Sequence, residues 1–104
     1  MYEALHFQNE DLLFEWDDEK SRSNFVKHGI RFQTAVKAFL DPRALVRLDE
    51  EHSQEQRYNL LGKVGRVLFV VYVKKEEATI RIISARIATK LEQERYEYGA
   101  EEDE

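Results

Sequence analysis

The sequence contains no cysteine, a single proline, four glycines and three histidines among its 104 residues. The absence of cysteine excludes a disulfide framework, thiolate zinc sites, iron–sulfur clusters and a cysteine nucleophile. The three histidines are scattered along the chain, which counts against a zinc site as well. We therefore expect no metal and no other cofactor, in a protein that is compatible with a reducing cytoplasm.

Long apolar runs are also absent. No stretch approaches the roughly 20 residues that a helix needs to cross a bilayer, and the first residues lack the basic start and apolar run of a secretory signal. No Gly-, Pro- or Ser-rich linker and no repeat divides the chain. We expect a single domain over residues 1–104 with a core at about 14–98, loosely ordered ends at 1–12 and 100–104, and a soluble, cytoplasmic location without membrane contact.

The charge is unevenly distributed along the chain. The formal net charge is -5, yet residues 52–100 hold nine Lys or Arg against six Asp or Glu, and residues 101–104 are all acidic. A positive C-terminal half can meet a polyanion or an acidic partner. The charge of the whole chain argues against the strong nonspecific nucleic-acid affinity that basic proteins show.

Apolar periodicity and end signals predict three helices. Asp17 or Asp18 caps the first, and Gly29 supplies the left-handed residue that commonly ends a helix. The second has its apolar residues at helical spacing and stops before Pro42. The segment 89–92 fits a capping box at the start of the third. The predicted helices cover about residues 18–28, 32–40 and 89–98.

Strand signals precede the first helix and fill the space between the second and the third. The short connections between the last three strands predict an antiparallel meander with the doubly apolar segment 66–74 in its centre. The predicted order is β-α-α-β-β-β-β-α, an α+β fold with helices packed against an antiparallel sheet. The predicted strands are residues 12–16, 44–48, 56–61, 66–74 and 79–85.

The polar pattern that most favours chemistry lies in the C-terminal half, where His52, Arg57, Arg81 and Arg86 occur with Glu55 beside them. Arg57 and Arg81 fall on strands that flank the central one, so they converge on one sheet face if the registers allow. Guanidinium groups gathered there would clamp a phosphate, since each pairs with it bidentately. For any one arginine alone the simpler interpretation is a surface ion pair, and for His52 it is a solvated loop residue.

The first helix carries a polar stripe of Lys20, Asn24 and Lys27 at i, i+4 and i+7, which is a candidate contact for RNA or a partner. Solvated surface is the alternative, and for His28 with Lys27 we favour attraction to the negative end of the helix dipole. The aromatic residues are expected mostly to fill a core rather than to stack on bases, namely Phe14, Trp16, Phe32, Phe39, Phe69 and Tyr72.

Two segments in a fixed order give the chain a specific signature. KHGI followed by Phe32 occupies residues 27–32, and RIISAR-x-AT-x-x-E occupies residues 81–92. Together with other matching positions they resemble the BrnT family of toxins over about residues 14–97. Those other positions are Phe14–Asp17, Lys20, Asn24, Phe39–Pro42, Glu55, Arg57, Gly62, Ile80 and Tyr96.

The resemblance implies a RelE-like α+β fold and a ribonuclease toxin of a type II toxin–antitoxin system that inhibits translation. It also implies a BrnA-type antitoxin with a DNA-binding domain, through which alone the complex would contact operator DNA. The implied chemistry is metal-independent attack of a ribose 2′-OH on the neighbouring phosphate. Arg57 and Arg81 match family motif positions and would stabilise the phosphoryl charge, with Arg86 next, while His52 or Glu55 would transfer the proton.

A noncatalytic interaction module with the same fold is the alternative. It is suggested by the acidic net charge, the thirteen residues that precede Phe14, and the acidic run at residues 101–104. An adjacent reading frame for a DNA-binding antitoxin would favour the toxin. A small metabolic enzyme ranks last, because no cofactor or metal motif is present.

Overall fold

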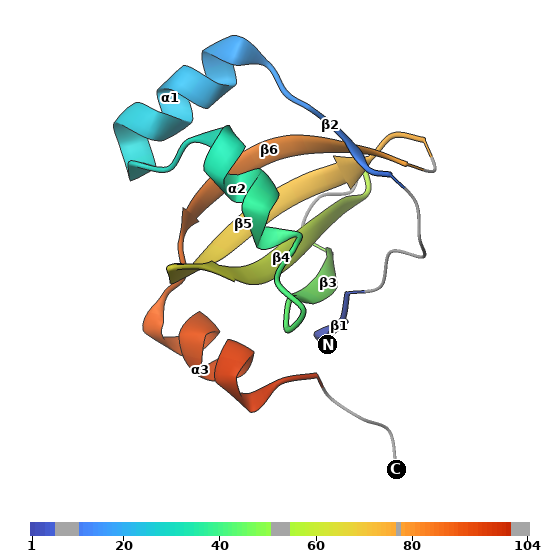
Figure 1. Ribbon diagram of the computed structural model, residues 1–104, viewed down its shortest axis with the longest axis vertical. Helices are drawn as coiled ribbons and strands as arrows, with labels where there is room; N and C mark the ends of the chain where they lie inside the picture. The colour runs from blue at the N-terminus through green and yellow to red at the C-terminus, as the bar shows by residue number, and fades with distance from the viewer. Residues whose placement is uncertain (6–10, 51–54, 77, 101–104) are drawn as a thin grey trace.

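The computed structural model describes residues 1–5, 11–50, 55–76 and 78–100, which form a mixed sheet with three helices (Figure 1). The strands lie in the order β1-β3-β4-β5-β6-β2. No helix in these described ranges is long and apolar enough to span a membrane. The elements are β1 (Glu3–Ala4), β2 (Leu13–Glu15), α1 (Asp18–His28), α2 (Phe32–Ala38), β3 (Leu45–Asp49), β4 (Arg57–Val64), β5 (Arg66–Lys74), β6 (Thr79–Ile87) and α3 (Lys90–Tyr98).

The helix ends confirm the capping signals of the sequence. The side chain of Asp17 accepts a hydrogen bond from the backbone N–H of Lys20 at 3.0 Å, and Gly29 closes α1 with a φ of 73°. At α3, Thr89 and Glu92 form both hydrogen bonds of the predicted capping box. The second helix is shorter than predicted, because its regular part ends at Ala38.

The α+β prediction is confirmed, but one edge departs from the expected antiparallel sheet. Strands β3 to β6 form an antiparallel meander with β5 between β4 and β6, as predicted. At the far edge, β2 pairs with β6 in parallel, with Phe14 opposite Ile80. Connection lengths specify the direction of strands that follow each other in a hairpin. They leave open the direction of β2, whose partner comes much later in the chain.

The first residues of the chain, which belong to the segment expected to be loosely ordered, contact the sheet and α3. Glu3 and Ala4 pair with β3, and the ring of Tyr2 is buried in a cluster with Tyr96 of α3. Burial of an aromatic ring and a short ladder of hydrogen bonds fix this end of the chain. The expectation for residues 6–10 and 101–104 falls outside the described residues.

The two faces of the sheet carry different helices. Leu60 and Val70 pair across β4 and β5 and belong to the core that also contains Phe32 of α2. Their neighbours Leu61 and Phe69 also pair, but they belong to the cluster that contains Tyr96 of α3. Successive side chains of a strand point to opposite faces. The sheet therefore has a face covered by α2 and an opposite face, called the α3 face below, on which α3 packs at one end.

Asn24 fastens α1 to the sheet. Its Nδ2 donates to the carbonyl oxygens of Ile30 at 2.9 Å and Ala85 at 2.8 Å, and its Oδ1 accepts from the backbone N–H of Ala85 at 3.1 Å. The residue is only 7% exposed. Asn24 is therefore neither solvated surface nor a contact for RNA or a partner, because its carboxamide hydrogen-bonds to the backbone of β6 as a neighbouring strand would.

Candidate functional site

Arg57 and Arg81 lie on the α3 face on either side of Val73. Val73 pairs directly with Arg81, while Tyr58, the residue after Arg57, pairs with Tyr72. Neighbouring strands lie about 4.8 Å apart, so the two arginine backbones are separated by roughly 10 Å. Both long side chains can reach a ligand above Val73. The structure thus brings these two predicted residues together, and we call them the arginine row.

Each arginine of the row has a carboxylate next to it. An oxygen of Glu55 lies 3.5 Å from Arg57 Nη2, and Arg81 Nη1 donates to Glu15 at 2.6 Å. The side chains of Arg81 and Glu15 are 32% and 44% exposed. Ion pairs with this exposure contribute little free energy and exchange readily with another anion. The simpler interpretation of each arginine, an ion pair, is therefore also present in the structure.

Arg57 has one further feature that Arg81 lacks. Its Nε atom is buried and finds no hydrogen-bond partner within the described part of the chain. A buried donor without a partner is uncommon in proteins and calls for an explanation, such as a group that binds nearby. Of the two proton-transfer candidates, Glu55 lies beside the row, whereas His52 lies outside the described residues.

Arg86 lies on the α3 face but away from the row. It pairs with Phe69, which is four residues before Val73 on β5 and therefore roughly 13 Å from it along the strand. Its two terminal nitrogens donate to the carboxylate of Glu92 at 2.7 and 3.0 Å, and its guanidinium stacks over Phe69 at 4.2 Å. Arg86 thereby joins β6 to the start of α3.

The contact with Arg86 also affects the pKa of Glu92. Burial alone would raise the pKa of Glu92, but hydrogen bonds from Arg86 and from the backbone of Thr89 outweigh it and hold the pKa below its ordinary value. The carboxylate therefore stays ionised and serves both the capping box and the arginine. This bidentate pair holds Arg86 in place more firmly than a single contact would.

The predicted RNA contacts Lys20, Lys27 and His28 form no hydrogen bond or ion pair with the arginine row in the part of the chain that the structure describes. All three are exposed on α1. This helix is fastened through Asn24 to Ala85, a residue of the core on the other side of the sheet from α3. The start of α1 is nearer to the row: a hydrogen bond from the backbone N–H of Lys20, and to a smaller degree the charge of Arg81, lower the pKa of Asp17.

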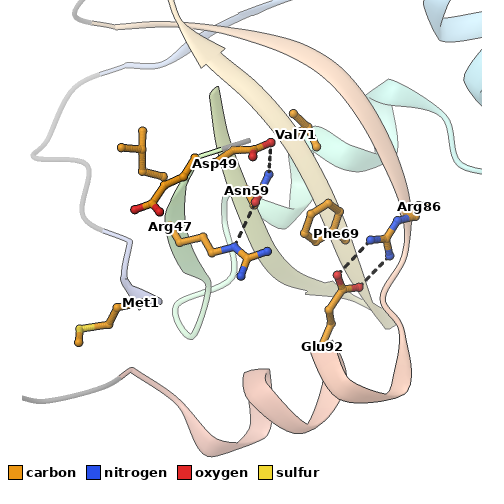
Figure 2. Close-up of a pocket in the computed structure, with 10 residues that line it drawn as sticks. Met1, Arg47, Asp49, Asn59, Phe69, Val71, Arg86 and Glu92 are labelled. Atoms are coloured by element: carbon orange, nitrogen blue, oxygen red, sulfur yellow. Dashed lines mark hydrogen bonds and ion pairs between the residues drawn. The ribbon is translucent and has the colours of Figure 1, made fainter. Parts of the chain in front are cut away.

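A pocket of about 550 Å³ lies on the α3 face beside the row, and the sequence analysis missed several residues that line it. Figure 2 shows Arg47, Asn59 and Asp49 on one side of it and the Arg86–Glu92 pair on the other, with Phe69 between them. Alternation along β3 could have placed Arg47 and Asp49 on one face. The face on which Arg47 and Asp49 lie depends on the pairing of Arg47 with Asn59, and the sequence does not specify this pairing.

The aromatic residues expected in a core all belong to or pack against one of the two apolar clusters. Phe39 contacts both Phe14 and Tyr72 edge to face in the core beneath α2, and Trp16 packs against Phe32. Phe69 packs against the cluster that contains Tyr96 and also lines the pocket of the α3 face. Within the described ranges, no three His, Asp or Glu side chains gather closely enough to hold a metal ion.

Comparison with known proteins identifies the family to which the chain belongs. The sequence model for the ribonuclease toxin BrnT of type II toxin–antitoxin systems matches residues 16–92. The chain belongs to the BrnT family. A crystal structure of the ribonuclease toxin BrnT from Brucella abortus has a similar fold, with a TM-score of 0.59 and 21% sequence identity over 76% of this chain and 99% of that one. No curated protein sequence matched the chain.

Proposed function

We propose that this member of the BrnT family is an endoribonuclease that needs no metal ion. It cleaves RNA by attack of a ribose 2′-OH on the adjacent phosphate, which breaks the bond from phosphorus to the 5′-oxygen of the next nucleotide and leaves a 2′,3′-cyclic phosphate. The observation that carries the proposal is the arginine row, in which Arg57 and Arg81 share one sheet face on either side of Val73. Negative charge gathers on the phosphoryl oxygens in the transition state, and preorganised cations stabilise it. The row supplies two such cations.

Glu55 is the group that we assign to proton transfer. It lies beside Arg57, so its carboxylate can accept the proton of a 2′-OH whose neighbouring phosphate is held by that arginine. His52 is the other candidate and belongs to the loop that precedes Glu55. Arg86 would act differently from the row, as a positioning residue that holds α3 and Phe69 at the side of the site.

The carboxylates of Glu15 and Glu55 lie beside the row, so an RNA phosphate that binds there would meet arginines that are already paired. A phosphate that approaches Arg81 competes with Glu15 for the same guanidinium, and the exposed ion pair offers little resistance. Arginine has five N–H donors in a planar fork, so Arg57 can also bind a phosphate while it keeps its contact with Glu55. The ion pairs thus hold the side chains extended over the sheet until substrate binds.

The partners follow from the family. We propose that a BrnA-type antitoxin neutralises the toxin in the cytoplasm by covering the α3 face, and that the complex contacts operator DNA only through the antitoxin. RNA cleavage by the free toxin would inhibit translation. Lys20, Lys27 and His28 remain candidate RNA contacts, on the surface of α1.

A second candidate function is an interaction module without catalytic activity. The observation that favours it is the carboxylate beside each of the three candidate arginines, since a fully occupied guanidinium has no charge to offer a phosphate. Under this alternative the antitoxin partner is retained and cleavage is absent. A neighbouring antitoxin gene combined with an inactive purified protein would support it.

Substitution of both members of one ion pair tests the proposal. Arg81→Ala should reduce the rate of RNA cleavage on the order of 100- to 1000-fold, the usual effect of losing one preorganised charge-stabilising group. Glu15→Gln should leave cleavage intact or raise it, because it removes the anion that competes with phosphate. Arg66→Ala, an exposed arginine at the start of β5, is the control. A folded Arg81→Ala protein with undiminished cleavage would remove Arg81 from the mechanism.

A further inference from the structure

The pocket of the α3 face adjoins the arginine row. Asn59 in the pocket follows Arg57 by two residues on β4, and Val71 precedes Val73 by two residues on β5. Two residues of a strand span about 7 Å, so the pocket begins one side chain away from the row. Its volume of about 550 Å³ is in the range of pockets that bind small ligands. A ligand whose phosphate contacts the row can therefore place its next group in the pocket.

One side of the pocket suits a flat group. Phe69 and Val71 provide apolar surface, and the guanidinium of Arg86 lies over the Phe69 ring at 4.2 Å. Unpaired nucleobases stack on aromatic rings and on guanidinium planes when proteins recognise single-stranded RNA. The bidentate pair with Glu92 keeps the Arg86 plane fixed before any ligand arrives.

The opposite side holds a hydrogen-bond donor and an acceptor next to each other. Asn59 is 3% exposed, and its Oδ1 accepts from Arg47 Nε at 3.1 Å while its Nδ2 donates to Asp49 at 3.4 Å. Stacking on the Tyr2 ring at 4.7 Å also restrains the Arg47 guanidinium. A single buried carboxamide therefore positions a cation and a carboxylate side by side at the pocket wall (Figure 2).

Hydrogen-bond donors of Arg47 lie beside acceptor atoms of Asp49 at this wall. Arg47 uses its Nε–H for Asn59, and the four N–H donors of its terminal nitrogens bond to no other residue in the described part of the chain. Asp49 accepts a hydrogen bond from Asn59, and a carboxylate has about four acceptor positions, so it can hold several hydrogen bonds at the same time. The wall thus presents donors beside acceptors.

We propose that this pocket takes a guanine base of the RNA substrate and so sets the sequence preference of cleavage. The Watson–Crick edge of guanine carries the O6 acceptor next to the N1–H and N2–H donors, which match Arg47 next to Asp49. Uracil presents acceptors at both ends of this edge, and adenine and cytosine offer only an amino group to the carboxylate. Asn59 acts as the positioning residue for both side chains. This inference rests on the proposed function, because that function supplies RNA as the ligand.

Binding to oligonucleotides that cannot be cleaved tests the pocket separately from catalysis. We would measure the affinity of the full chain for 2′-deoxy oligonucleotides of sequence UUGUU, UUAUU, UUCUU and UUUUU by fluorescence anisotropy. The missing 2′-OH prevents cleavage, so only recognition is measured. UUGUU should bind roughly 10- to 100-fold more tightly than the other three, as expected for one base read by paired hydrogen bonds.

Two variants locate the preference. Arg47→Gln should bind all four oligonucleotides with similar affinity, whereas Arg66→Gln, an exposed arginine outside the pocket, should keep the preference for guanine. Circular dichroism verifies that both variants are folded. Equal affinities in the unsubstituted protein, preference for another base, absence of binding, or a guanine preference that persists in Arg47→Gln would each overturn the proposal.

The outcomes also separate this inference from the ribonuclease proposal. Guanine-selective binding by a protein that fails to cleave RNA would contradict the catalytic proposal and retain the pocket. Cleavage of RNA by a protein that binds the four oligonucleotides equally would retain catalysis and overturn the pocket.

Discussion

Replacement of Asn24 by alanine should destabilise the protein more than any other single change in α1. The substitution deletes three hydrogen bonds, two of them to the backbone of Ala85, which is completely buried. A buried backbone group that loses its partner costs about 1–3 kcal/mol, because water cannot replace the lost bond. The N–H and C=O of Ala85 both lose theirs, while the carbonyl of Ile30 lies in a less buried position.

The expected loss for Asn24→Ala is therefore about 3–4 kcal/mol in the free energy of unfolding. Alanine is the better helix former, and this gain of a few tenths of a kcal/mol offsets little of the loss. Domains of this size have a total stability of roughly 5–15 kcal/mol, so the variant would keep only part of its stability margin. At about 4–8 °C per kcal/mol, the melting temperature should fall by roughly 12–30 °C.

Urea unfolding followed by the fluorescence of Trp16 is a suitable assay. This is the single tryptophan of the sequence, and its ring packs edge to face against Phe32 at 6.1 Å, so it reports on the core beneath α2. Ser23→Ala is the matched control, an exposed neighbour in the same helix whose change should stay within about 0.5 kcal/mol. Asn24→Asp should be at least as harmful as alanine, since it directs a carboxylate oxygen at two carbonyls. A loss below about 1 kcal/mol for Asn24→Ala would refute this account of α1.

Two further predictions concern the packing of Gly62 and the response to acid. A Cβ atom at Gly62 would lie 2.5 Å from the carbonyl oxygen of Ala38, so Gly62→Ala should cost about 1–3 kcal/mol in thermal unfolding, whereas the exposed Lys63→Ala should be neutral. Burial alone would raise the pKa of Asp41, but hydrogen bonds from Tyr96, Arg43 and Lys63 lower it below its ordinary value. A lowered folded-state pKa gives stability that is complete above the unfolded-state value of about 4 and disappears as the pH falls through the folded-state value. Denaturation titrations should therefore show stability falling below about pH 5, with a shallower fall in Asp41→Asn; equal slopes in the two proteins would contradict the role given to this carboxylate.

The helices and the central strands were predictable because their signals are local. Gly29 and the capping box at residues 89–92 act within one or two helical turns, and the apolar segment 66–74 can only suit a strand with neighbours on both sides. The sequence predicted the bounds of β5 correctly for this reason. Similar reasoning confirmed the core role of Phe32 and Phe39.

Features that depend on long-range pairing were not predictable in the same way. The parallel pairing of β2 with β6 and the burial of Asn24 both join residues that are more than sixty positions apart in the chain. An asparagine at helical spacing between two lysines has the same local pattern whether it is solvated or buried. Only the unsatisfied backbone of β6 at Ala85 determines the outcome, and this backbone is not visible in the sequence of α1.

In the candidate site, too, features that follow from strand alternation were predictable, and features that depend on long-range pairing were not. Strand alternation made a shared face for Arg57 and Arg81 a reasonable hypothesis, and the registers of β4, β5 and β6 place them there. The sequence could not show that Glu15 would reach Arg81, because this pair depends on the parallel edge. Arg47 was missed for a related reason, since its place in the pocket depends on its pairing with Asn59.

Cleavage of purified RNA in the presence of EDTA tests the central claim most directly. The partner-free protein would be compared with the Arg57→Ala/Arg81→Ala double variant, after circular dichroism has verified that both are folded. The unsubstituted protein should cleave RNA without a metal ion and leave 2′,3′-cyclic phosphate ends, whereas the double variant should be inactive. Equal cleavage by both proteins, or cleavage that EDTA abolishes, would contradict it.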